Sequence, residues 1–242
     1  MPDAPLNIAD ASFDLIGIDG DDTLWHDIGN YNLTEEKYRT ILSAYCDLEN
    51  MGDILLKTER KNLKIFGFGV KGYTLSLIET AIEITNGQIK AEGIQQIIDL
   101  GKEMMSGSID ILDNVIEALE LLRPSYKIIV ITKGDLFHQE AKFARSGLTH
   151  FFDGLEVVSN KDVQTYGALL SRYKIAPENF LMVGNSLPSD ILPVLELGAW
   201  GVHIPYHTVW EMEHSDKDIS DISRAVTLDN LVDVPNLLLG DK

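Results

Sequence analysis

The feature that most constrains the fold of this chain is an alternation of short apolar segments, rich in β-branched residues, with segments whose apolar residues follow helical spacing. Strand-like segments occupy residues 13–19, 127–132, 155–158, 180–184 and 200–204. Helical spacing is found in residues 115–122, 136–143 and 163–173. Strands that alternate with helices in this way form a parallel sheet covered on both faces. The sequence therefore predicts an α/β fold with a doubly wound, Rossmann-like parallel sheet, and residues 224–228 as a further edge strand.

The connection between the first two predicted strands is too long for a single crossover. It runs from residue 23 to residue 127, whereas a complete strand–helix–strand unit takes about 30 residues. Apolar residues at helical spacing between residues 38 and 105 indicate several helices. We therefore predict a small α-helical cap domain at residues 27–109, inserted into a core made of residues 1–26 and 110–242. Ligands bind at the carboxyl ends of such sheets, so we expect the insertion to lie over that end as a lid.

The first predicted strand ends in the sequence Asp19-Gly20-Asp21-Asp22-Thr23. Two carboxylates separated by one residue at a strand end repel each other, unless a cation or a transferring group lies between them. An aspartate there can attack phosphorus and form an aspartyl-phosphate, while the second carboxyl handles the proton of the leaving group or of water. The motif alone also fits an ordinary acidic turn or a calcium loop, so the other strand ends must discriminate between these interpretations.

The next two strand ends carry groups that suit an anion. Thr132-Lys133-Gly134 offers a hydroxyl, a cation and backbone N–H groups at the start of a helix, which is typical of a phosphate-binding turn. The alternative is a helix capped by Thr132 with an exposed Lys133. Lys161 follows the third strand. Most surface lysines have no special role, but at this end of the sheet the charge of Lys161 can offset both Asp19 and a phosphate.

The fourth turn, which follows residues 180–184, contains Asp190. Mg²⁺ prefers hard oxygen ligands, and Asp190, Asp19 and the backbone carbonyl of Asp21 would supply them, with water and phosphate completing the shell. The alternative is an acidic residue in the first turn of a helix, where the helix dipole favours it.

In this order, the four turns resemble the haloacid dehalogenase-like (HAD) hydrolase superfamily, in its branch with a helical cap inserted after the first motif. The resemblance implies that Asp19 is the nucleophile, Asp21 the general acid/base, Thr132 and Lys161 the phosphate binders and Asp190 a magnesium ligand. It also favours phosphate chemistry, because true dehalogenases form an ester at a carbon centre and need neither a metal nor the second carboxyl.

The sequence departs from the family pattern at three positions, one of which, Asp162 after Lys161 where proline is common, concerns only the local backbone. Asn185 stands where the family usually has a further aspartate, which removes a negative charge, although an amide oxygen can still bind or orient Mg²⁺ or its water. Asp22 stands where glycine is common, and we expect its side chain to face solvent. Trp25, at the exit toward the insertion, is expected to be a packing residue of the hinge rather than a substrate contact.

Charge and cysteine content limit the partners and the compartment. The chain has 20 Lys and Arg residues against 38 Asp and Glu, a formal net charge of −18, which disfavours nucleic acid and anionic membranes as partners. A phosphorylated substrate then requires a metal ion and specific lysines as local positive charge. Cys46 is the single cysteine. With no apparent secretion signal or membrane-spanning run, the sequence predicts a cytoplasmic protein.

The predicted function is therefore a magnesium-dependent phosphomonoester hydrolase, a phosphatase that acts on a small phosphorylated metabolite through an aspartyl-phosphate intermediate. One alternative is a phosphomutase, which would use the same intermediate to phosphorylate a second hydroxyl. Another is a non-catalytic protein that binds a phosphorylated ligand, for which Asn185 is the only support in the sequence.

Overall fold

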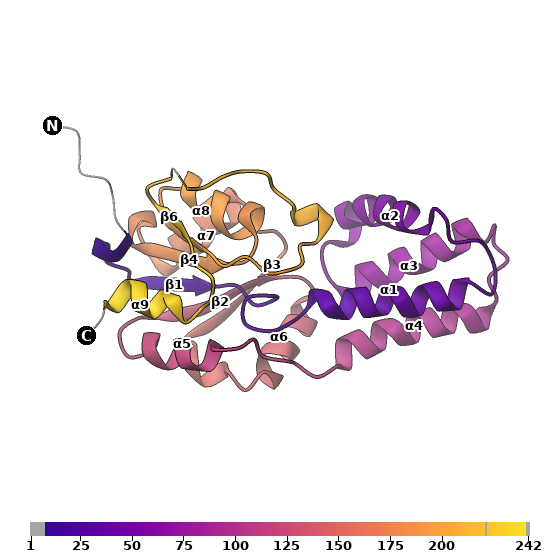
Figure 1. Ribbon diagram of the computed structural model, residues 1–242, viewed down its shortest axis with the longest axis horizontal. Helices are drawn as coiled ribbons and strands as arrows, with labels where there is room; N and C mark the ends of the chain where they lie inside the picture. Colours follow the sequence, from indigo (N-terminus) through magenta and orange to yellow (C-terminus); the bar gives the residue numbers. More distant parts are fainter. Residues whose placement is uncertain (1–7, 221, 241–242) are drawn as a thin grey trace. The chain divides into compact units, whose positions relative to one another are not determined.

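The computed structural model describes residues 8–220 and 222–240, which divide into two compact units (Figure 1). The first unit comprises the described residues up to Ile28, the segment Ile109–Thr132 and the described residues from Glu140 onward. The second unit comprises Gly29–Ser108 and Lys133–Gln139.

The first unit is built on a sheet with the strand order β3-β2-β1-β4-β5-β6. β1 pairs in parallel with β2 and with β4, β4 with β5, and β5 with β6. The strands are β1 Leu15–Ile18, β2 Ile128–Lys133, β3 Gly154–Val158, β4 Phe180–Gly184, β5 Trp200–His203 and β6 Ala225–Thr227. This arrangement confirms the predicted α/β class and places an edge strand within residues 224–228, as expected.

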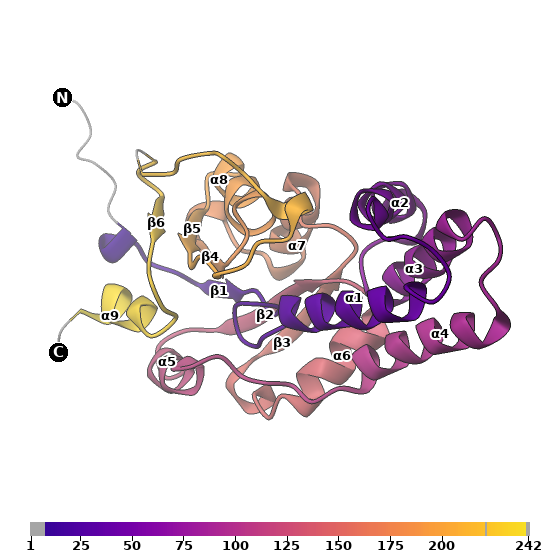
Figure 2. The same ribbon diagram turned by 45° about the vertical axis from the view of Figure 1, so that its right-hand side comes forward.

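Helices cover both faces of the sheet because successive strand residues point to opposite sides (Figure 2). Ile16 and Ile18 belong to a cluster with α5 (Val115–Leu122) and α9 (Asp233–Leu239). Leu15 belongs to a second cluster with α7 (Val163–Tyr173) and α8 (Leu192–Glu196). No helix in the described part of the chain is both long and apolar enough to cross a membrane.

The strand order makes the carboxyl ends of β1 and β4 neighbours at the switch point of the sheet. From β1 the chain continues to β2 and β3 on one side, and it then returns to β4 on the other side of β1. Ligands of doubly wound sheets bind outside the strands at such a point. The Asp19 backbone N–H donates to the carbonyl of Val183 at 2.9 Å, so the turns after β1 and β4 begin side by side.

The second unit contains four helices with a core of their own. They are α1 Ile28–Leu42, α2 Met51–Phe66, α3 Val70–Ile84 and α4 Ala91–Ser106. At Gly101 of α4, a Cβ would lie 2.3 Å from Oγ1 of Thr74, so glycine permits the close approach of α3 and α4. α1 begins ten residues before the first apolar residue of the expected helix, because the polar Thr34 occupies a buried position in its first half.

The second unit also includes the segment Lys133–Gln139, which the sequence-based division assigned to the core. The Asp135 carboxylate accepts a hydrogen bond from the backbone N–H of Lys71 at 3.2 Å. The Lys133 ammonium lies over the ring of Phe68, 4.2 Å from its centroid. A Cβ at Gly69, whose φ is +128°, would lie 2.7 Å from Asp135, so the absence of a side chain there allows this contact.

The helical unit contains a carboxyl group that opposes folding when it is ionised. Glu59 of α2 is half-buried, and burial together with the nearby Glu35 raises its pKa to about 7. A carboxyl with a raised pKa in the folded state destabilises that state at any pH above its ordinary value, and the penalty grows until the pH passes about 7. Stability should therefore increase when the pH falls through 7.

We predict that Glu59→Gln raises the free energy of unfolding at pH 8 by about 1 to 3 kcal/mol and has much less effect near pH 5, because the penalty is absent there. Denaturant titrations at both pH values measure the difference. Glu36→Gln, at an exposed position of α1, is the matched control. An equal gain at the two pH values would contradict the assignment of the penalty to the Glu59 charge.

Candidate active site

Asp19 lies directly after β1 and is buried at the carboxyl edge of the sheet. All four residues of β1 are buried, so the strand holds the position of Asp19 firmly. The Thr23 hydroxyl lies 3.2 Å from Oδ2 of Asp19 and 3.4 Å from Oδ1 of Asn185, and it can donate to either of them. The Asn185 amide therefore faces the same space as Asp19.

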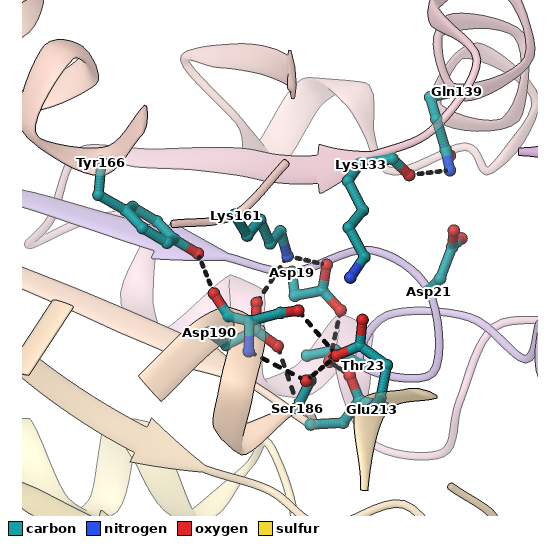
Figure 3. Close-up of polar contacts among 12 residues, drawn as sticks. Asp19, Asp21, Thr23, Lys133, Gln139, Lys161, Tyr166, Ser186, Asp190 and Glu213 are labelled. Carbon is teal, nitrogen blue, oxygen red and sulfur yellow. Dashed lines mark hydrogen bonds and ion pairs between the residues drawn. The ribbon is translucent and has the colours of Figure 1, made fainter. Parts of the chain in front are cut away.

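Lys161 joins two of the predicted site carboxylates (Figure 3). Its ammonium forms an ion pair with Oδ1 of Asp19 and another, at 2.6 Å, with Oδ1 of Asp190. Lys161 is only 4% exposed. Its position is held by the start of α7, where the side chain of Asp162 accepts the backbone N–H of Thr165 at 2.8 Å and caps the helix. The structure thus brings Asp19, Lys161 and Asp190 together.

The turn after β4 presses Asp190 against the end of its own strand. Residues Leu187–Ile191 form a π-helical turn, and the backbone N–H of Ser186 donates to Oδ2 of Asp190 at 3.0 Å. A Cβ at Gly184 would lie 2.3 Å from that same carboxylate oxygen. Only glycine fits there, and Asp190 is 1% exposed as a result.

Glu213 holds this turn from outside, and sequence analysis did not find it. Its carboxylate accepts hydrogen bonds from the hydroxyls of Ser186 and Ser189, the second at 2.7 Å (Figure 3). Glu213 ends a three-residue 3-10 helix, Glu211–Glu213, after β5, and so short an element has no periodicity that would mark an inward-facing side chain. The two serines of the turn were the available signal, since buried hydroxyls require partners.

The charges at Asp19 and Lys161 are strongly coupled. Burial raises the pKa of the Asp19 carboxyl to about 7, although the charge of Lys161 acts in the opposite direction. Burial alone would lower the pKa of Lys161, but the charges of Asp19 and Asp190 outweigh it and raise that pKa well above its ordinary value. One lysine thus serves two carboxylates. When both carboxylates are ionised, they carry one negative charge more than Lys161 offsets. A further cation beside them would therefore favour the ionised form of Asp19.

Asp21 is held by a different lysine. Its Oδ1 accepts a hydrogen bond from Nε1 of Trp25 at 2.6 Å and forms an ion pair with Nζ of Lys142 at 2.5 Å. Lys142 belongs to α6 (Leu136–Arg145) and also pairs with Asp27 at 2.6 Å. Trp25 is fully buried, as expected of a packing residue, and its indole N–H contacts a site carboxylate in addition.

Sequence analysis did not identify Lys142, although α6 carries an unusual pattern. The large apolar side chains of Leu136 and Phe137 are exposed, whereas Lys142 is only 3% exposed. This reverses the distribution that hydrophobicity predicts for a helix. The reversal was not recognisable without knowing which face of the helix is buried.

The remaining predicted phosphate binders follow one another at the end of β2. Thr132 is buried, and Lys133 is the last residue of the strand. Gly134 has a φ of +139°, a conformation that favours glycine. The Gln139 side chain donates to the carbonyl of Lys133 at 3.0 Å and closes this turn. Lys133, Gly134 and Gln139 group with the second unit, so the predicted phosphate-binding turn spans the boundary in the chain between the two units.

The expectation that Asp22 faces solvent is wrong. Its carboxylate accepts hydrogen bonds from the backbone N–H groups of Asp27, at 2.8 Å, and Ile28, at 3.2 Å, at the start of α1. Its φ is +61°, the left-handed conformation in which glycine is favoured. An aspartate is tolerated here because its short polar side chain bonds the nearby backbone.

The residues at this site suit a hard divalent cation in their chemistry. Asp19 and Asp190 are carboxylates, and the amide oxygen of Asn185 shares the Thr23 hydroxyl with Asp19. The carboxylate of Asp21 instead contacts Lys142 and Trp25. The backbone carbonyl of Asp21 therefore remains the metal ligand that the sequence suggested for this residue. Among the described residues, no group of three or more His, Cys, Asp and Glu side chains is arranged to hold a metal, so the amide and backbone oxygens would have to complete the set.

We predict that Lys161→Met lowers the free energy of unfolding by about 3 to 5 kcal/mol at pH 8, because it leaves two buried carboxylates without their cation. Denaturant titration measures this loss. Lys217→Met, at an exposed position of the same unit, should change the stability by less than about 0.5 kcal/mol. Similar stabilities for the two variants would show that the ion pairs of Lys161 do not offset the burial of the carboxylates.

Comparison with known proteins gives three informative matches. The crystal structure of a haloacid dehalogenase-like family hydrolase from Xanthomonas campestris matches with 40% sequence identity and a TM-score of 0.83. This match covers 93% of this chain and 94% of that chain. A 2-haloacid dehalogenase from Pseudomonas syringae shares the fold at 20% identity, with a TM-score of 0.63 over 93% of this chain and 97% of that chain. Glyceraldehyde 3-phosphate phosphatase from Methanothermobacter thermautotrophicus is 30% identical over 113 residues, 43% of this chain and 49% of that protein.

The chain therefore spans about half the length of the curated relative that it matches. The family model of haloacid dehalogenase-like hydrolases, by contrast, matches residues 13–198, which include all four turns described above. This match covers well over half of the sequence and agrees with the strand order and with the resemblance of the turns. The chain belongs to the haloacid dehalogenase-like hydrolase family.

Proposed function

We propose that this protein is a phosphomonoester hydrolase that acts on a small phosphorylated metabolite through an aspartyl-phosphate intermediate. The observation that carries the proposal is the geometry of the two motif aspartates. Asp19 is paired with the buried Lys161, while Asp21 is held by separate donors, Lys142 and Trp25. Different surroundings are what give two neighbouring carboxyls different chemical roles.

In the first step, an Asp19 carboxylate oxygen attacks phosphorus, and the bond from phosphorus to the leaving oxygen breaks. Asp21 gives its proton to that oxygen, so the product leaves as a neutral alcohol. In the second step, Asp21 takes a proton from water, which attacks phosphorus, and the bond to Asp19 breaks to release inorganic phosphate. Lys161 and Thr132 bind the phosphate oxygens, and the positive charge of Lys161 offsets charge that develops on them.

Asp19, Asp190, the amide of Asn185 and the backbone carbonyl of Asp21 would hold Mg²⁺ at the same site. Bound there, the ion would act as a Lewis acid and neutralise part of the phosphate charge. A cation is needed because a chain with a net charge of −18 repels an anionic substrate. Lys161 alone does not give the site an excess of positive charge, since its ammonium group lies between two carboxylates.

The reaction class rests on Asp21 more than on the fold. A dehalogenase of known structure shares the fold, so the architecture itself is compatible with either chemistry. A carboxyl positioned by two donors supports proton transfer to an oxygen leaving group, which dehalogenation at carbon does not require. The similarity of nearly half the chain to a phosphatase supports the same class without naming the substrate. A phosphomutase would use the same first step and differ only in the acceptor of the phosphoryl group.

We predict that Asp19→Asn abolishes phosphate release while the protein stays folded, because an amide cannot form the acyl-phosphate. A panel of phosphorylated metabolites, assayed with and without Mg²⁺ for free phosphate and for isomeric products, identifies the substrate class first. Asp14→Asn, at an exposed position just before β1, is the matched control. Acid-quenched wild type should carry covalent phosphate on the Asp19 peptide. Phosphate release at the wild-type rate by folded Asp19→Asn would refute the nucleophile.

We predict that Asn185→Asp increases the affinity for Mg²⁺, because hard cations prefer anionic oxygen. Calorimetric titration of the protein with Mg²⁺ measures the dissociation constant without relying on turnover. Asn236→Asp adds the same charge at an exposed position of α9 and should leave the affinity unchanged. If both variants bind Mg²⁺ as the wild type does, residue 185 does not face the ion.

A further inference from the structure

One oxygen of the Asp21 carboxylate receives two strong donors. Nε1 of Trp25 and Nζ of Lys142 lie 2.6 and 2.5 Å from Oδ1. The carboxylate lies apart from the group formed by Asp19, Lys161 and Asp190 (Figure 3). Two strong donors on a single oxygen fix the orientation of the carboxyl group, and they make that oxygen a poor carrier for a proton. Lys142 and Trp25 therefore contribute to the orientation in which the Asp21 carboxyl meets a substrate.

Lys142 reaches this position as a buried charge with its own network. It is 3% exposed and also pairs with Asp27, 2.6 Å away, just before α1. Its ammonium lies 5.9 Å from the centroid of the Trp25 ring, whose N–H is the other donor to Asp21. A lysine without a partner is almost never fully buried, so the location of Lys142 depends on the two carboxylates.

We propose that Lys142 is a positioning residue for the proton transfer by Asp21: together with Trp25 it holds the carboxyl group in the orientation from which its proton reaches the leaving oxygen. The proposal rests on the proposed phosphatase reaction. Lys142 does not contact the reacting atoms, and it acts only through the orientation of Asp21. Without Lys142, the carboxyl loses one of the donors that hold its orientation.

The assay must separate this role from a merely structural one. A general acid matters most when the leaving group is a poor one, because a good leaving group departs without a proton. In a series of substituted phenyl phosphates the binding part of the substrate stays almost constant while the basicity of the leaving oxygen changes. A variant with a misplaced acid therefore loses more kcat/KM toward phenyl phosphate than toward p-nitrophenyl phosphate, whereas general damage lowers both equally.

The variants are chosen to keep the protein folded. Lys142→Met leaves Asp21 and Asp27 without their cation, so it is made in the Asp27→Asn background, where only one carboxylate remains to be accommodated. Lys142→Arg keeps a cation with several donors and serves as the rescue variant. Arg145→Met is the matched control, because Arg145 is exposed on the same helix and bonds the carbonyl of Ala141.

We expect Lys142→Met in the Asp27→Asn background to lose at least about tenfold more kcat/KM toward phenyl phosphate than toward p-nitrophenyl phosphate, relative to Asp27→Asn alone. Lys142→Arg should recover part of the difference, and Arg145→Met should show none. Equal losses on the two substrates in the Lys142 variants, with the wild type active, would overturn the positioning role alone. If the wild type releases no phosphate, or if Asp21→Asn does not steepen the dependence on the leaving group, the proposed function itself is wrong.

Discussion

The ion pairs of Lys161 with Asp19 and Asp190 are the interaction on which the remainder of the site depends. Through one ammonium group they join the end of β1, the turn after β3 and the π-helical turn after β4. Without that cation, the switch point of the sheet would contain two buried carboxylates that repel each other, and at least one of them would have to bind a proton. Lys161 offsets the charge of both carboxylates where the strand ends converge, and it is buried there, contrary to the usual preference of that side chain.

A second buried lysine repeats this arrangement for the next carboxyl in the motif. Asp19 and Asp21 are separated by a single residue, yet Lys161 holds the first and Lys142 holds the second. The two lysines come from different parts of the first unit, one before α7 and the other within α6. Two identical side chains thereby acquire different surroundings, which is the condition for one to act as a nucleophile and the other as an acid in the proposed reaction.

The sequence was sufficient for the parts of this structure that follow from periodicity and strand direction. The strands and the meeting of Asp19, Lys161 and Asp190 were predictable, because parallel strands present their carboxyl ends at one edge. Side chains buried by tertiary contacts were not predictable. Lys142 lies on a helix whose exposed residues include Leu136 and Phe137, and Glu213 ends a short 3-10 helix, Glu211–Glu213, that no apolar periodicity predicts. The start of α1 was missed because a threonine replaces an apolar residue on its buried side, and the role of Asp22 depends on a left-handed backbone conformation.

The bond network of Glu213 also affects how relatives of this chain should be compared. The family match ends at residue 198, so it includes every motif residue but not the carboxylate that holds Ser186 and Ser189. Two homologues with the same four motifs can thus differ in how firmly the fourth turn is tethered, because the tether is encoded in a segment that the motif alignment does not cover. A chain shortened after β5 would keep all of the motif residues and lose this tether.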